Sequence, residues 1–202
     1  MMKKPSLKTA LRTGVMMAAF LTLANCTASE PTTFYTLSES VPNVGVQQND
    51  PLRLGIGPIH LPAYLDRPQL VTRSSLTRMN VADFDQWAEP LDGLFLRTLA
   101  KNLSSRLATE RVVTLPARRN LPMDYQVEID VTRFDADATG DVVLDASWRI
   151  FDSESDQLLD HGHSISRWQA ALADNYEAIA LAMSHCLGLM SAEIAEALTE
   201  AG

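Results

Sequence analysis

The feature that most constrains the fold is the hydrophobic period, which changes between the middle and the end of the chain. Apolar residues alternate with polar ones in two successive runs: Tyr125, Val127, Ile129 and Val131, then Val142, Leu144, Ala146, Trp148 and Ile150. A period of two places the apolar side chains of a strand on one face. A third strand is expected from Leu158 to Trp168. The pattern predicts an antiparallel meander with one covered face and one face in water.

Two segments with a helical period can supply that cover. The first has apolar residues at Leu91, Leu94, Phe95, Leu99, Leu103 and Leu107. The second, from Asp174 to about Glu200, has Tyr176, Ile179, Ala180, Met183, Leu187, Met190, Ile194 and Leu198. Such spacing is typical of amphipathic helices that bury one face. We therefore predict an α+β fold, a single domain in which an antiparallel β-sheet has two amphipathic helices packed on one face.

Shorter β-prone segments are expected to extend the sheet. They are Thr32–Leu37, a stretch that begins at Leu52, a hairpin of Gln69–Arg73 and Leu76–Val81 around Ser74-Ser75, and Arg111–Pro116. Each is bounded by Gly, Pro, Ser or amide side chains, which favour turns and loops.

The amino terminus has the pattern of an export signal. Positive charges at Lys3, Lys4, Lys8 and Arg12 precede the uncharged run Thr13–Ala24. That run is about a dozen residues long, whereas a membrane-spanning helix needs about 20. The run is therefore expected to be cleaved rather than kept.

The run closes on Leu23-Ala24-Asn25-Cys26, which resembles the lipobox of bacterial lipoproteins. The resemblance implies a diacylglycerol thioether on Cys26, cleavage before it, and an acyl chain such as palmitate on the new amino group. Asn25 departs from the small residue that usually precedes the cysteine. A plain secreted protein with a free Cys26 and an uncleaved anchor are the alternatives. Because Thr27 is not Asp, the sorting rule of enteric lipoproteins implies the outer membrane, with the protein on its periplasmic face.

These features divide the chain into three parts. Residues 1–25 are the expected signal peptide, residues 26–33 the lipidated terminus and a short tether, and residues 34–202 the folded domain. The tether from Thr27 to Thr33 spans at most about 23 Å at roughly 3.3 Å per residue, so the domain is expected to sit close to the bilayer.

Charge excludes one class of partner. The chain has 17 basic and 25 acidic residues, and four of the basic ones leave with the signal, so the mature net charge is −12. A domain this acidic is repelled by phosphate backbones, and we expect no nucleic-acid partner.

Evidence for catalytic chemistry is weak. His161 and His163 point the same way in a strand and are weak candidates for a metal site, but the spacing nominates no third ligand. The stretch Gly162–Ser166 approaches a nucleophile-elbow motif but ends in Ser rather than Gly and lies inside a strand. We therefore predict no enzyme activity, no metal and no cofactor other than the lipid on Cys26.

The segment Leu61–Arg73, "LPAYLDRPQLVTR", presents a stiff and extended set of side chains. Pro62 and Pro68 flank Tyr64–Arg67, and a proline disfavours helical geometry in the residue before it. Two interpretations are open: a partner or oligomer interface, which favours rigid Tyr, Trp and Arg, or an internal brace. The residues concerned are Tyr64, Leu65, Asp66, Arg67, Pro68 and Trp87.

This segment, with "WAEPL" and "FLRTLAKNL", resembles the ABC-type transport auxiliary lipoprotein family, which includes the paraquat-inducible protein C lipoproteins. "FYTL", "VVLDASWRI" and "LMSAEIAEAL" extend the similarity over nearly the whole mature chain. The resemblance implies a non-catalytic outer-membrane subunit that forms a homo-oligomer and docks an MCE-domain protein of an ABC-type intermembrane lipid transport system. The alternative is a periplasmic lipid-binding carrier with an apolar cavity.

Overall fold

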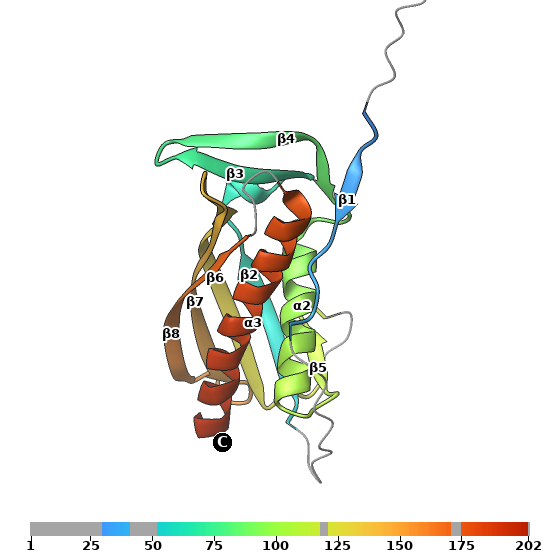
Figure 1. The fold of residues 1–202 in the computed structure, drawn as a ribbon. Helices are drawn as coiled ribbons and strands as arrows, with labels where there is room; N and C mark the ends of the chain where they lie inside the picture. The colour runs from blue at the N-terminus through green and yellow to red at the C-terminus, as the bar shows by residue number, and fades with distance from the viewer. Residues whose placement is uncertain (1–29, 41–51, 118–120, 171–174, 202) are drawn as a thin grey trace, which may run out of the picture. The chain divides into compact units, whose positions relative to one another are not determined.

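The computed structural model describes residues 30–40, 52–117, 121–170 and 175–201. Residues from Thr32 onward form one compact unit (Figure 1). Cys26, the signal peptide, most of the tether and Asp174, the expected start of the last helix, lie outside the described residues.

In the described part of the chain, eight strands form one sheet. They are β1 (Thr33–Tyr35), β2 (Leu54–His60), β3 (Gln69–Ser75), β4 (Arg78–Trp87), β5 (Val112–Thr114), β6 (Tyr125–Ala136), β7 (Asp141–Asp152) and β8 (Leu158–Gln169). The strand order is β1-β4-β3-β6-β2-β5, while β7 pairs with the other edge of β6 and β8 pairs with β7. The long strand β6 therefore pairs with β2 over its first half, with β3 at Ala136, and with β7 along its length.

The predicted meander is present, and the sheet as a whole is mixed. Strands β6, β7 and β8 pair antiparallel, as their alternation predicts, and so do β3 and β4. The pairs β1–β4, β2–β5, β2–β6 and β3–β6 are parallel. Parallel neighbours need long crossover connections, and the chain supplies one between β2 and β6 that includes the β3–β4 hairpin and a helix. The hairpin turns at Leu76-Thr77, two residues later than predicted.

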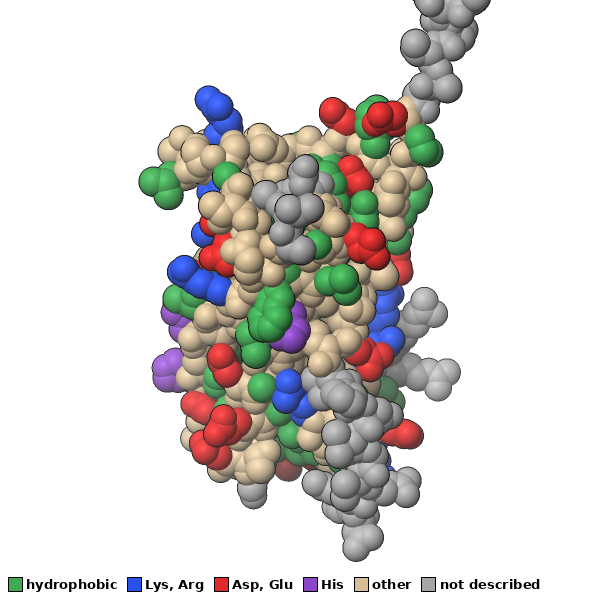
Figure 2. Space-filling view, in the orientation of Figure 1, with side chains coloured by type: hydrophobic (Ala, Val, Ile, Leu, Met, Phe, Trp, Pro, Cys, Tyr) green, Lys and Arg blue, Asp and Glu red, His purple; other side chains and the backbone are tan. Residues whose placement is uncertain are grey.

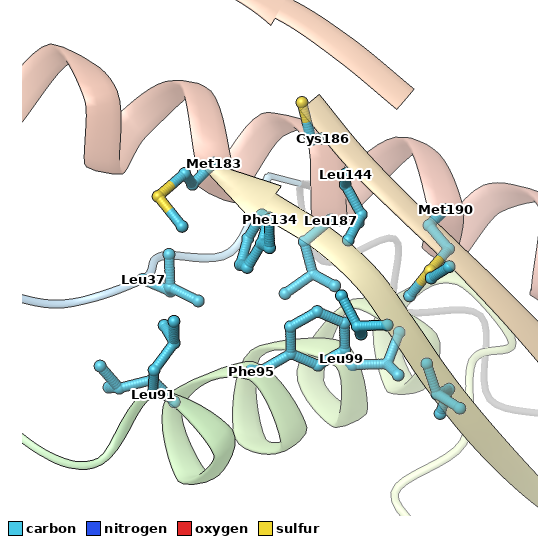
Figure 3. Packing of buried hydrophobic residues seen from close by; sticks show 14 of the residues in the cluster. Leu37, Leu91, Phe95, Leu99, Phe134, Leu144, Met183, Cys186, Leu187 and Met190 are labelled. Atoms are coloured by element: carbon cyan, nitrogen blue, oxygen red, sulfur yellow. The ribbon is translucent and has the colours of Figure 1, made fainter. Parts of the chain in front are cut away.

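Helices α2 (Leu91–Arg106) and α3 (Tyr176–Ala201) lie on the same face of the sheet, which confirms the α+β prediction (Figure 1). Their apolar stripes meet over β6. Phe95 of α2 contacts Phe134 of β6 edge to face, with ring centroids 5.5 Å apart, and Leu99 and Leu187 fill the space beside them (Figure 3). All four side chains are fully buried, so the interior between helices and sheet is packed.

Helix α3 is long and apolar enough to cross a membrane by length and composition alone. Two-thirds of its most hydrophobic window is buried inside the unit, however. Since α3 packs against β6, β7, β8 and α2, its hydrophobicity is explained by its place in the core.

Packing against Trp148 explains why glycine stands between the two histidines of β8 at position 162. Gly162 lies directly opposite Trp148 of β7, and the indole ring covers the position that a side chain would occupy. A Cβ at Gly162 would lie 2.2 Å from Cζ2 of Trp148. The ring is itself held by the hydrogen bond that Nε1 of Trp148 donates to Oγ of Ser164. Glycine is therefore required at this position for packing.

Replacing Gly162 with Ala is expected to lower the free energy of unfolding by about 1–3 kcal/mol, because the added methyl displaces a buried ring. Urea denaturation followed by fluorescence measures the change. Gly93→Ala is the matched control, since nothing lies within 4 Å of its added methyl and alanine favours the helix, so it should be neutral or stabilising by up to about 1 kcal/mol. Equal stability of the two variants would contradict the packing argument.

Candidate partner-binding site

A hollow of about 770 Å³ opens where the ends of β2 and β4 meet the start of α2. It is lined by Phe34, residues 59–61, residues 65–68 and residues 86–92. The two stretches of sequence that stood out, "YLDRP" and "WAEPL", thus reach the same surface feature although about 20 residues separate them along the chain.

Backbone hydrogen bonds hold these two stretches together. The short 3₁₀ helix η2 (Ala63–Leu65) follows Pro62, whose carbonyl accepts from the N–H of Leu65 at 2.9 Å. The carbonyl of Pro68 accepts from the N–H of Trp87 at 2.7 Å, which fixes the end of the segment to the end of β4. Pro68 cannot donate a backbone hydrogen bond, yet its carbonyl makes the connection.

The structure separates five of the six residues into two groups. Leu65 and Trp87 are each 4% exposed and belong to the core, where they form the inner wall of the hollow. Asp66, Arg67 and Pro68 are exposed at the hollow. Burial of Leu65 and Trp87 fits the internal brace, whereas for the exposed Asp66, Arg67 and Pro68 the interface interpretation stays a prediction.

Tyr64 contributes to a buried polar network behind the hollow. Its hydroxyl donates to Oδ2 of Asp135 at 2.8 Å and accepts from the N–H of Phe134 at 3.3 Å. The carboxylate of Asp135, fully buried, also accepts from Nη2 of Arg73 at 3.0 Å and from Nε of Arg133 at 2.9 Å. Two guanidinium groups and one phenol therefore compensate one buried charge.

The side chains of Tyr64 and Arg73 both stay protonated at neutral pH. Burial, with the nearby Asp135 charge, raises the pKa of Tyr64 to about 12, so the phenol remains a donor. The hydrogen bond to Asp135 raises the pKa of Arg73 above its ordinary value. The group therefore connects β3, η2 and β6 through hydrogen bonds and ion pairs.

Sequence reasoning missed Asp135, Arg73 and Arg133, although the sequence held one signal, the apolar Val143 among the polar positions of β7. A bulge after Val131 shifts the alternation of β6, so that Phe134 faces the helices and Asp135 faces the opposite side. Val143, the exception in the polar positions of β7, pairs with Asp135 and is also buried. An apolar residue on the expected wet face indicates that this end of the sheet is covered on both sides.

The candidate metal and hydrolase residues lie away from the hollow, on β8. His161 and His163 are exposed, and Nε2 of His163 lies 2.7 Å from Oδ1 of Asp145. This hydrogen bond holds the pKa of the Asp145 carboxyl below its usual range. Among the described residues, no group of three or more His, Cys, Asp or Glu side chains could hold a metal ion.

Ser164 is buried and faces away from its neighbouring histidines, because successive side chains in a strand point to opposite faces. Its hydroxyl donates to Oε2 of Glu193 on α3 and accepts from Nε1 of Trp148. The arrangement joins a strand to a helix, and at 1% exposure the Ser164 hydroxyl is closed to a substrate.

Cys186 is buried on α3, where its Sγ donates to the carbonyl of Val142 at 3.7 Å. Burial raises the pKa of this thiol to about 12, so it stays protonated and unreactive at neutral pH.

The chain belongs to the family of ABC-type transport auxiliary lipoprotein components, whose family model matches residues 35–195. Membership indicates a membrane-associated periplasmic lipoprotein with an auxiliary role in transport.

Solved structures share the fold. An uncharacterized protein is 24% identical with a TM-score of 0.67, over 84% of this chain and 99% of that one. A DUF330 family protein from Xanthomonas campestris is 16% identical with a TM-score of 0.67, over 81% of this chain and 92% of that one. No curated protein matches the chain.

Replacing Asp135 with Ala is expected to lower the free energy of unfolding by about 3 kcal/mol, because two partly buried guanidinium groups lose their counter-charge. Asp130→Ala is a matched control on the same strand. Its ion pair with Arg149 is about 40% exposed on both sides, so its loss should cost at most about 1 kcal/mol. Chemical denaturation of both variants measures the difference. A loss from Asp135→Ala no larger than that of the control would show that the network does not stabilise the fold.

Proposed function

We propose that the protein is an outer-membrane-anchored docking subunit of an ABC-type intermembrane lipid transport system, and that its partner is an MCE-domain periplasmic protein. The observation that supports this proposal most is the convergence of both family stretches on one exposed hollow. The anchor would hold this docking surface at the membrane, and assembly of several copies would multiply it.

The hollow has the composition of a docking site. Leu65 and Trp87 give it a rigid apolar wall, and Asp66 and Arg67 offer charges of both signs at its rim. A buried apolar centre with a polar rim is the usual anatomy of a protein interface. The folded structure positions these side chains before any partner arrives, which reduces the entropy lost on binding.

Reversing both rim charges, Asp66→Lys with Arg67→Glu, is expected to weaken binding of the MCE-domain partner at least about tenfold, a change of about 1.4 kcal/mol. Co-purification and surface plasmon resonance measure it. The control Glu154→Lys with Arg167→Glu makes the same charge change at exposed positions in the β7–β8 turn and on β8. Equal effects of the two pairs would remove the hollow as the docking site.

The lipid anchor can be tested by counting thiols in the mature protein. The chain has two cysteines, and Cys186 is buried with a raised pKa. If Cys26 has become a thioether, a thiol reagent should label nothing in the folded protein and one thiol after denaturation. Two thiols in denaturant would contradict lipidation, and an intermediate value would measure how far Asn25 slows it.

The lipid-carrier alternative is less well supported because side chains fill the space between the helices and the sheet (Figure 3). A carrier would have to use the surface hollow instead, whose volume lies within the range of ligand pockets. Native mass spectrometry distinguishes the two functions and also gives the oligomer number. Bound phospholipid on the protein purified from cells would favour the carrier.

A further inference from the structure

The β3–β4 hairpin has an apolar surface that the docking role does not use. We call Leu76, Val81 and Phe84 the hairpin surface; their side chains are 94%, 42% and 38% exposed. Among the described residues, Leu76 is the most exposed large apolar side chain. Apolar side chains project from the tip of the hairpin in the space-filling view (Figure 2). Exposed apolar residues gathered on one element often mark a contact surface.

The first strand in the described part of the chain, β1, lies beside the hairpin in the sheet. Strand β1 pairs with β4, Phe34 lying beside Gln86, so the chain that comes from Cys26 enters the sheet on the hairpin (Figure 1). β1 covers only the last three residues of β4, and no described strand pairs with this side of β4 from Arg78 to Phe84.

The tether limits how far from the bilayer the end of the sheet with β1 and the hairpin can lie. If Cys26 is lipidated, as the proposed function holds, Thr33 lies at most about 23 Å from the anchor. Strands β6 and β7 are each 12 residues long, about 40 Å at roughly 3.3 Å per residue. Because β3 joins β6 at its last residue, Ala136, the start of β6 is the far end of the sheet.

We propose that the hairpin surface inserts into the headgroup region of the bilayer that holds the anchor. Leucine and phenylalanine favour that region, and a second attachment beside the lipid chains would fix the orientation of the domain. Arg78 and Asp83 are both exposed on β4 and their charges cancel, so the strand gains no net attraction to an anionic or a cationic surface. A zwitterionic phospholipid surface is therefore the occupant that the charges favour.

The experiment uses the full lipidated protein in phosphatidylcholine vesicles whose acyl chains are brominated, which quench nearby tryptophan. Leu76→Trp places a reporter on the hairpin surface. Leu158→Trp is the control, because Leu158 is 45% exposed and lies at the start of β8, beside the end of β7 and far from the hairpin. The three native tryptophans contribute equally to both variants and are subtracted with the wild type.

The added fluorescence of Leu76→Trp is expected to be quenched at least about twofold more than that of Leu158→Trp. Equal quenching in protein that floats with the vesicles would overturn the inference and leave the anchor intact. Failure of the wild-type protein to float would overturn the anchor and this inference together. If the reporter of the Leu76→Trp variant is already shielded in detergent, without a bilayer, the inference is overturned in favour of a second copy of the chain.

A second measurement needs no substitution. Amide hydrogen exchange of the wild-type protein should slow in the β3–β4 turn when vesicles replace detergent micelles, with no change in the β7–β8 turn. Unchanged exchange in the β3–β4 turn would overturn the inference.

Discussion

The ionic network around the buried carboxylate of Asp135 is the interaction on which the end of the sheet near the hairpin depends. A charge removed from water is costly unless ionic and hydrogen-bonding partners compensate it. Here Arg73 of β3, Tyr64 of η2 and Arg133 of β6 do so together. Since β3 and β6 share a single residue pair in the sheet, the network supplies much of the connection between them. The network therefore ties η2 and the β3–β4 hairpin to β6.

The regular parts of the fold could be predicted from the sequence because their periods are local. The stripe of α3 and the alternation of β6 and β7 each determine which face is buried, and the structure has them within a few residues of the expected bounds. The parallel pairs could not be predicted in this way. Pairing of β2 with β6 brings together residues about 70 positions apart, and neither strand has a local signal for its neighbour.

The candidate site was recognised in part for a similar reason. The prolines around Tyr64–Arg67 marked a stiff segment, but a sequence does not show which of its side chains point inward. The structure places Leu65 and Trp87 inside and Asp66, Arg67 and Pro68 outside. The segment and the end of β4 thus combine residues that build the wall of the hollow with residues that are exposed at its rim. Asp135 was missed because the bulge in β6 reverses the alternation just before it.

The chemistry of the described residues agrees with an auxiliary role. The thiol of Cys186 and the hydroxyl of Ser164 are both buried and hydrogen-bonded within the core. The exposed features are a hollow with a mixed-charge rim and an apolar hairpin. On this account the protein contributes by position. Its lipid anchor would determine which membrane holds it, and its rigid fold would present one surface to the partner.

In-cell photocrosslinking tests that account most directly. A photoreactive amino acid replaces Pro68 at the hollow in one strain and Thr139 in the β6–β7 turn in another, since both residues are exposed. The account predicts a crosslink from position 68 to an MCE-domain protein in the membrane fraction, and none from position 139. A partner captured equally from both positions, or from position 139 alone, would contradict it.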